Sequence, residues 1–319
     1  IIGIIGYRFI HVLNRIGTWV LGIGIVLGFA YILTHVQTDD FLTRGSFNIS
    51  GWLATVSLAA LWQIAFAPYV SDYSRYLPAD VPVASTFWTT SLGTVLASSL
   101  SFVFGAVAGL ATPVGMDTMD AVKLATGSIG PLMLVLFLLS VISHNALNLY
   151  GAVLSLITLV QTFAYRWIPT AKSRAVLSVI VLGACCFAAV GASADFIGQF
   201  VDMVLVLLVV LVPWTAINLI DFYAIHKGKY DIDSIFHVDG GIYGRYNPQA
   251  LLAYAIGILV QIPFMNTPLY VGPISEHING ADLSWVVGLV ITSPLYWWLA
   301  NRDSAYKRRL SSGKLATSL

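Results

Sequence analysis

The sequence predicts an all-α polytopic membrane protein, and its composition is the first reason. Of its 319 residues, 58% are hydrophobic and 10% are charged, and the mean hydropathy is +0.83. So few charged residues cannot cover the surface of a soluble protein of this length. The second reason is a series of apolar stretches that each supply the ~20 residues needed to cross a bilayer. The formal net charge of +1 offers no basic field for nucleic acid, which excludes that class of partner.

Eight stretches without Asp, Glu, Lys or Arg predict eight membrane-spanning helices in one transmembrane domain. The longest stretch is interpreted as one helix, because Gly127, Ser128, Gly130 and Pro131 are typical of the loop that leads into it. Residues 1–6 are apolar but too short to cross, so they predict the end of a helix that begins earlier. The predicted helices are 16–36, 49–71, 84–112, 131–163, 175–193, 199–222, 248–268 and 283–300, with a cytoplasmic loop at 223–247 and a cytoplasmic tail at 301–319.

The basic residues predict how these helices are oriented. When successive loops are assigned to alternate sides, all of the 16 Lys and Arg residues except Arg44 and Lys123 fall on one side. Loops rich in Lys and Arg stay in the cytoplasm. We therefore expect a multi-pass protein of the cell membrane with both chain ends in the cytoplasm. The basic tail is expected to contact lipid headgroups.

Several chemistries lack the residues they would need. No Glu or Lys lies inside a predicted span, and the His-Glu-x-x-His pattern of a membrane metalloprotease is absent. The acidic loop from Asp231 to Asp239 has no Glu in the register of a calcium-binding loop, because position 242 is Ile. Cys185 and Cys186 are adjacent and are interpreted as packing residues. The sequence therefore predicts no metal and no cofactor, and favours a neutral polar and aromatic site for a flat, uncharged solute.

The predicted helix 49–71 carries the first candidate site residues. Pro68 has no amide hydrogen, so the helix is expected to kink or open there, as in many transporter substrate sites. Trp62 offers a flat face for a heteroaromatic ring, and Gln63 offers a donor and an acceptor. Asp72 and Arg75 are candidates for a gate where the helix leaves the membrane. Proline kinks without a ligand, an interfacial role for tryptophan, and a surface ion pair are the alternatives.

The predicted helix 131–163 carries a second polar group near its middle. His144 and Asn148 are four residues apart, and Asn145 and Asn148 are three apart, so each pair shares a helix face. These residues are expected to line a cavity, with hydrogen bonds between helices as the alternative. His144 is a possible proton carrier, and a neutral, hydrogen-bonded histidine is the other interpretation.

Three segments carry a resemblance to a known family. They are APYVSDYSRYLP at 67–78, NALNLY at 145–150, and NLIDFY at 218–223 followed by GKYD at 228–231. The sequence resembles nucleobase-cation symporter family 1, the cytosine/purine permeases with their hydantoin and allantoin relatives. The matching segments occur in the same order, and the similarity covers essentially the whole chain. The resemblance implies a twelve-helix, leucine-transporter-like fold of five-plus-five inverted repeats. It also implies an N-terminally truncated chain, with the end of helix 4 at 1–6 and helices 5 to 12 following.

The resemblance also implies roles for individual residues. In the family a tryptophan of helix 6 stacks on the base and an asparagine of helix 8 hydrogen-bonds to it, which Trp62 and Asn148 match best. Gln63 competes with Trp62 because the alignment is loose by one residue there. Sodium-coupled relatives use two adjacent helix 8 hydroxyls, where this chain has Ile142 and Ser143. Ser143 is thus the candidate cation ligand, and the coupling ion stays open between Na⁺ and H⁺.

These expectations predict a secondary active transporter. It would import a nucleobase, cytosine or a purine, by cation-coupled alternating access, with the lipid bilayer as its other partner. A symporter for another small heterocycle, such as hydantoin, allantoin, uracil or a vitamin, is the alternative. A membrane-embedded enzyme and a non-transporting sensor are the alternatives from other classes of protein.

Overall fold

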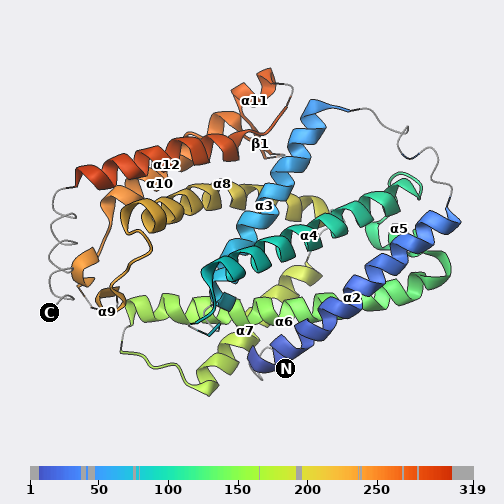
Figure 1. The fold of residues 1–319 in the computed structure, drawn as a ribbon, viewed down its shortest axis with the longest axis horizontal. Helices are drawn as coiled ribbons and strands as arrows, with labels where there is room; N and C mark the ends of the chain where they lie inside the picture. Colours follow the sequence, from blue (N-terminus) through green and yellow to red (C-terminus); the bar gives the residue numbers. More distant parts are fainter. Residues whose placement is uncertain are drawn as a thin grey trace. The chain divides into compact units, whose positions relative to one another are not determined.

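A computed structural model describes most of the chain as helices (Figure 1). Its contacts form two compact units, Ile1–Ser46 with Asp72–Ala194, and Phe47–Ser71 with Asp195–Leu319. We call them unit 1 and unit 2 and describe each by itself. Each unit has its own buried core, and the single transmembrane domain stays a prediction. The described residues are 7–36, 41, 47–74, 77–78, 80–164, 166–191, 196–235, 237, 239–267, 269–278 and 280–303.

Unit 1 consists of helices whose ends follow from local chemistry. The Asp117 side chain accepts from the Met119 amide at the start of α5, and Thr170 accepts from the Ser173 amide at the start of α7. Pro131 stands in the first turn of α6, where its missing amide hydrogen costs no helical hydrogen bond. The elements are α2 (Tyr7–His35), α4 (Val83–Leu110), α5 (Thr118–Ala125), η1 (Gly127–Ile129), α6 (Gly130–Phe163) and α7 (Ala171–Val190).

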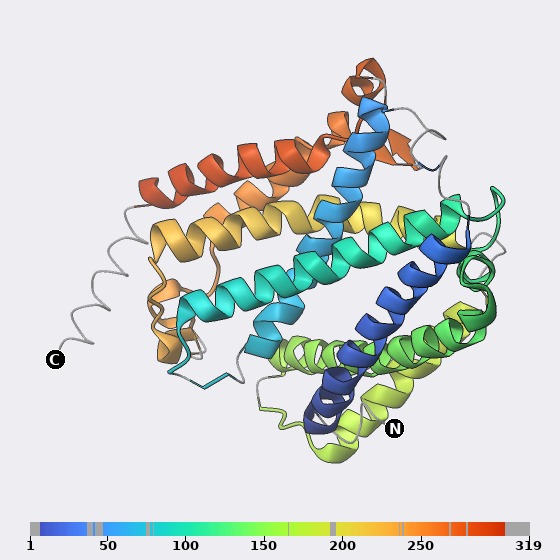
Figure 2. The same cartoon turned by 45° about the vertical axis from the view of Figure 1, so that its right-hand side comes forward.

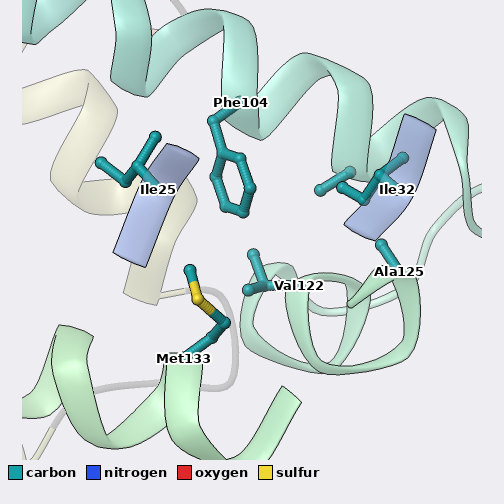
Figure 3. Packing of buried hydrophobic residues seen from close by; sticks show 7 residues of the cluster. Ile25, Ile32, Phe104, Val122, Ala125 and Met133 are labelled. Carbon is teal, nitrogen blue, oxygen red and sulfur yellow. The ribbon is translucent and has the colours of Figure 1, made fainter. Parts of the chain in front are cut away.

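The core of unit 1 forms where α2 runs antiparallel to α6. Gly28 of α2 permits this approach, because a Cβ there would lie 2.8 Å from the Phe104 ring and 3.2 Å from Met133. Where α2 ends and α6 begins, the Ser128 amide donates to the Tyr31 hydroxyl at 3.2 Å. Figure 3 shows the Phe104 ring surrounded by aliphatic side chains of the other helices. The buried residues of this core are Ile25, Ile32, Phe104, Ala108, Val122, Ala125 and Met133.

Unit 2 combines long helices with short connecting elements. Its two-stranded antiparallel sheet pairs Asn266 with Val271 and Thr267 with Tyr270. The helices are α3 (Ile49–Ser74, in this unit up to Ser71), α8 (Phe196–Leu219), the π-helix η2 (Ile220–Ile225), α9 (Ile232–Ile235), η3 (Gly241–Tyr243), α10 (Pro248–Leu259), η4 (Ile262–Phe264), α11 (Pro273–His277) and α12 (Ser284–Arg302). The strands are β1 (Asn266–Thr267) and β2 (Tyr270–Val271).

Helices α8, α10 and α12 pack side by side in unit 2, as Figures 1 and 2 both show. Ala253, Tyr296 and Ala300 form the buried contact between α10 and α12. Helix α3 joins this group through Leu61, which packs against two buried residues of α8. The Trp285 indole also donates to the Ser57 hydroxyl at 3.0 Å. Helix α3 therefore belongs with the C-terminal helices rather than with its neighbours in sequence.

Six helices in the described part of the chain are long and apolar enough to cross a membrane. They are the regions Asn14–His35, Ile49–Ser71, Val83–Leu110, Gly127–Phe163, Ala171–Val190 and Asp202–Ile225. This agrees with a polytopic membrane protein. The last two of the eight predicted spans do not reach this criterion, because Pro248–Phe264 is short and the polar residues and Pro294 of α12 lower its hydropathy.

Two helix ends differ from the prediction for physical reasons. The helix predicted at 248–268 ends at Leu259, because the ring of Pro263 obstructs the carbonyl four residues earlier. The helix predicted at 199–222 continues as the π-helix to Ile225 and so enters the predicted loop. Residues 1–6 and most of the predicted tail, from 304 onward, lie outside the described residues.

Candidate functional site

Helix α3 has two opposite faces near its middle. Ser57, Leu61 and Ile64 follow the four-and-three spacing of one face and pack within unit 2. Leu61 is only 2% exposed, whereas the next residue, Trp62, is 58% exposed. The two side chains therefore point to different sides of the helix.

The Trp62 side of α3 carries further aromatic residues. Phe66 and Tyr69 follow Trp62 by four and seven residues, so all three share one face. The Phe66 and Tyr69 rings stack, with centroids 5.9 Å apart and an interplanar angle of 16°. We call Trp62, Phe66 and Tyr69 the aromatic face of α3. Sequence reasoning selected Trp62 alone, although the same spacing would have included the other two.

The predicted helix break and gate also lie on α3. The helix is continuous from Ile49 to Ser74 with Pro68 inside it, so no unwound segment is present at the proline. Arg75 and the side chain of Asp72 lie outside the described residues. Gating by Pro68, Asp72 and Arg75 therefore stays a prediction.

Helix α6 positions the other predicted site residues within unit 1. The Ser143 hydroxyl donates to Asn14 Oδ1 of α2 at 2.6 Å. The Asn148 Oδ1 atom is buried, and no described residue supplies it with a hydrogen-bond partner. His144 and Asn145 are exposed. One buried acceptor is thus left open near the middle of this helix.

The two halves of the predicted site belong to different units. Trp62 and Gln63 lie in unit 2, whereas Ser143, His144, Asn145 and Asn148 lie in unit 1. The meeting of Trp62 and Asn148 around one planar guest stays a prediction.

Comparison with known proteins identifies the family. The family described as "Permease for cytosine/purines, uracil, thiamine, allantoin" matches residues 1–288. The chain belongs to this permease family. It is therefore a multi-pass membrane transporter rather than an enzyme.

Two curated relatives extend this match. The permease is 33% identical to the "Putative purine-cytosine permease YxlA" of Bacillus subtilis, over 97% of this chain and 68% of that protein. It is 22% identical to the "Purine-cytosine permease fcyB" of Emericella nidulans, over 91% of this chain and 59% of that protein. The chain thus spans about two thirds of the length of the first relative and less than two thirds of the second. No solved structure gives a significant match.

The permease also contains a polar cluster that sequence reasoning missed. Asp221, in the π-helix of unit 2, accepts hydrogen bonds from the hydroxyls of Tyr230 and Tyr296, each at 2.6 Å. His226 Nδ1 lies 3.1 Å from Asp221 Oδ2. We call Asp221, His226, Tyr230 and Tyr296 the Asp221 cluster. The sequence did contain a signal for this cluster, namely a single acidic residue at the end of an apolar helix. Such a residue needs polar partners in or near a membrane.

The Asp221 cluster joins three elements of unit 2 by hydrogen bonds. Its carboxylate joins the end of α8 to the following loop through Tyr230 and to α12 through Tyr296. Charge-assisted bonds of this kind are about twice as strong as neutral ones. In the part of the chain that the structure describes, no three His, Cys, Asp or Glu side chains converge as metal ligands.

Proposed function

We propose that the permease imports a nucleobase, cytosine or a purine, across the plasma membrane by cation-coupled alternating access. Its family is described by this substrate class, and both curated relatives are named purine-cytosine permeases. Both chain ends are then cytoplasmic, as the distribution of Lys and Arg predicts. The observation that carries the proposal is the open acceptor on Asn148.

A buried acceptor without a donor is costly, and the one on Asn148 lies among the residues selected as the candidate site, so we expect a guest to bind there. Leaving such a group unmatched costs about 1–3 kcal/mol. The exocyclic amino group of cytosine or adenine is a donor that would match Asn148 Oδ1. A solute that supplies this donor recovers the cost on binding, which favours nucleobases over solutes that only accept hydrogen bonds.

The aromatic face of α3 supplies the second kind of contact that a base requires. Stacking of a base on an aromatic side chain contributes about 1–3 kcal/mol in nucleic-acid-binding proteins. Trp62 offers the largest ring of the three, and Gln63 follows it in sequence as a possible hydrogen-bonding partner. In this proposal Trp62 stacks on the base while Asn148, with Asn145, binds its polar edge.

The coupling ion is proposed to bind near Ser143. Because the Ser143 hydroxyl donates its hydrogen to Asn14, its oxygen lone pairs remain for a cation. A single hydroxyl is a sparse sodium site, and a proton carried by His144 is the other candidate. In either case an ion that binds together with the base couples the ion gradient to uptake.

A second candidate substrate class follows from the family description, which also names uracil, thiamine and allantoin. Uracil and allantoin carry ring or amide N–H donors that could also match Asn148. The discrimination among these solutes depends on which donors the complete site accepts.

Uptake by membrane vesicles tests the proposed function. The full-length protein would be reconstituted and supplied separately with labelled cytosine, adenine, uracil and allantoin, under a sodium gradient alone or a proton gradient alone. We expect saturable accumulation of cytosine or adenine, dependent on one of the two gradients. Accumulation of allantoin or uracil instead would favour the second class. Binding without accumulation under either gradient would contradict transport.

A further inference from the structure

Helix α8 contains a proline that leaves one backbone carbonyl without its helical donor. Pro213 lies inside α8 and is fully buried. A proline has no amide hydrogen, so the carbonyl of Val209, four residues earlier, loses its usual partner. In a membrane-spanning segment such a carbonyl has to be matched by another protein group or by water.

Gln261 supplies the missing donor from outside α8. Its Nε2 atom donates to the Val209 carbonyl at 2.9 Å and to the Gly257 carbonyl at 2.8 Å. Gln261 is completely buried, and both hydrogens of its amide group are thereby used. Within the described residues its Oε1 atom has no partner, so a glutamine at this buried position carries the cost of an unmatched acceptor. That cost is consistent with a specific task for the donor side.

Close packing fixes Gln261 in this place. A Cβ on Gly288 of α12 would lie 2.7 Å from Gln261 Cδ and 2.8 Å from Val212 Cγ1. On the other side, a Cβ on Gly257 would lie 2.8 Å from the Pro213 ring. The two glycines therefore allow α10 and α12 to close around the proline of α8, and the glutamine has little freedom to turn away.

The same part of α8 supports α3. Leu208 and Val212 pack against Leu61 in one buried cluster, and Leu61 directly precedes Trp62. Val212 thus contacts α3 through Leu61 and also lies in the tightly packed space beside Gln261 and Gly288. A change in the path of α8 at Pro213 would therefore move the surface against which Leu61 packs.

We propose that Gln261 is a positioning residue that completes α8 at Pro213 and thereby sets the place of the aromatic face of α3. It does not contact the substrate in this scheme. It acts through Val209, Val212 and Leu61. The link from the aromatic face to uptake rests on the proposed function, whereas the link from Gln261 to α8 does not.

A double-mutant cycle tests the link within α8. Gln261→Met removes the donor at similar volume, and Pro213→Ala restores a backbone amide that can bond to the Val209 carbonyl. In the full-length protein, Gln261→Met is expected to lower the Tm by about 3–6 °C relative to the parent. In the Pro213→Ala background, the same change is expected to lower the Tm by less than half as much relative to Pro213→Ala alone. Pro294→Ala is the matched control. It restores a backbone amide in α12 that can bond to the Val290 carbonyl and not to that of Val209. The fall in Tm caused by Gln261→Met should therefore be as large in the Pro294→Ala background as in the parent protein.

Transport kinetics test the link to α3. Gln261→Met is expected to raise KM about fivefold, because a displaced α3 would stack less favourably on the base. Pro213→Ala should reverse most of this rise. A merely structural role would lower the Tm and leave KM unchanged, and that result would overturn the positioning role.

The remaining outcomes also decide the inference. An equal loss of Tm in the parent and in the Pro213→Ala background would overturn the link between Gln261 and Val209. If Gln261→Met does not fold, a folded double variant supports the link and an unfolded one overturns it. If no nucleobase is taken up even by the parent protein, the proposed function fails, and the cycle of Tm values decides the α8 link by itself.

Discussion

At the scale of single residues, two amide side chains differ in what their hydrogen-bonding atoms are proposed to do. Gln261 donates both of its amide hydrogens to backbone carbonyls, so its donor side is structural. Asn148 has a buried oxygen that no described residue matches, and we propose that this oxygen accepts a hydrogen bond from the substrate. In a bilayer, neither group has bulk water as an alternative partner. The sequence shows only that both residues have an amide side chain. The difference between them is visible in the groups that surround each amide in the structure.

The Asn148 acceptor leads to the first prediction. Asn148→Leu keeps a similar volume and removes the acceptor, so KM for cytosine or adenine is expected to rise about 10- to 100-fold. The Tm should not fall, because the variant also removes an unmatched polar atom. Asn148→Asp keeps an acceptor oxygen and should impair uptake less than the leucine variant does. An unchanged KM in Asn148→Leu would remove this residue from the site.

The indole of Trp62 leads to the second prediction. Trp62→Ala is expected to abolish saturable uptake, because the stacking surface is lost. Trp52→Ala is the matched control, since Trp52 lies on the same helix, is 52% exposed, and is placed by the sequence near the outer end of the span. Normal kinetics in Trp62→Ala, measured as initial uptake rates over a range of concentrations, would show that the indole does not bind the substrate.

At the scale of elements, prolines and polar clusters decide where helices end and how they are joined. Pro263 ends α10 at Leu259, and the π-helix carries α8 on to Ile225. Hydropathy locates apolar helices because the hydrocarbon core penalises every charged residue in them. It does not locate these ends, because each depends on one backbone hydrogen bond. A π-helix is rare and is often found at functional sites.

The Asp221 cluster leads to the third prediction. Asp221→Asn replaces one acceptor oxygen by an amide donor, so at least one of the hydroxyls of Tyr230 and Tyr296 loses its partner. We expect a loss of about 1–3 kcal/mol of stability, measured as a lower Tm in detergent. Asp239→Asn is the control, because Asp239 is exposed and accepts a local hydrogen bond from the amide of Gly241. Equal Tm values for both variants would show that the cluster does not hold the loop to α12.

At the scale of the whole molecule, the distribution of charge predicts orientation. Loops with Lys and Arg are expected inside, and the few basic residues in the other loops make the rule decisive. The orientation is therefore predicted from the loops and their charges. The two units each contribute apolar helices to the membrane part of the protein.

Orientation is the fourth prediction, and labelling of single cysteines tests it. Cys185 and Cys186 would first be replaced by Ala. Asp239→Cys, in the predicted cytoplasmic loop, should react with an impermeant maleimide only after cells are permeabilised. Met116→Cys, in the exposed loop after α4, should react in intact cells. The reverse pattern would invert the proposed topology.

The candidate site could be predicted only in part. The family and the membrane class follow from the sequence and are confirmed by the comparison with known permeases. Trp62 and Asn148 follow from spacing and resemblance, and their roles stay predictions. Phe66 and Tyr69 were missed although they follow Trp62 at helical spacing. The Asp221 cluster was missed because the significance of its members depends on neighbours that spacing alone does not reveal.

The sequence by itself determined that this protein belongs in a membrane, that it is a permease, and where its apolar segments lie. These properties are local, since the bilayer acts on each residue according to its own polarity. Only the tertiary structure decided which polar groups are matched. The bond from Tyr296 to Asp221 joins residues 75 positions apart, and that from Gln261 to Val209 joins residues 52 positions apart. Such bonds depend on the packing of whole helices, and no single stretch of sequence contains that information.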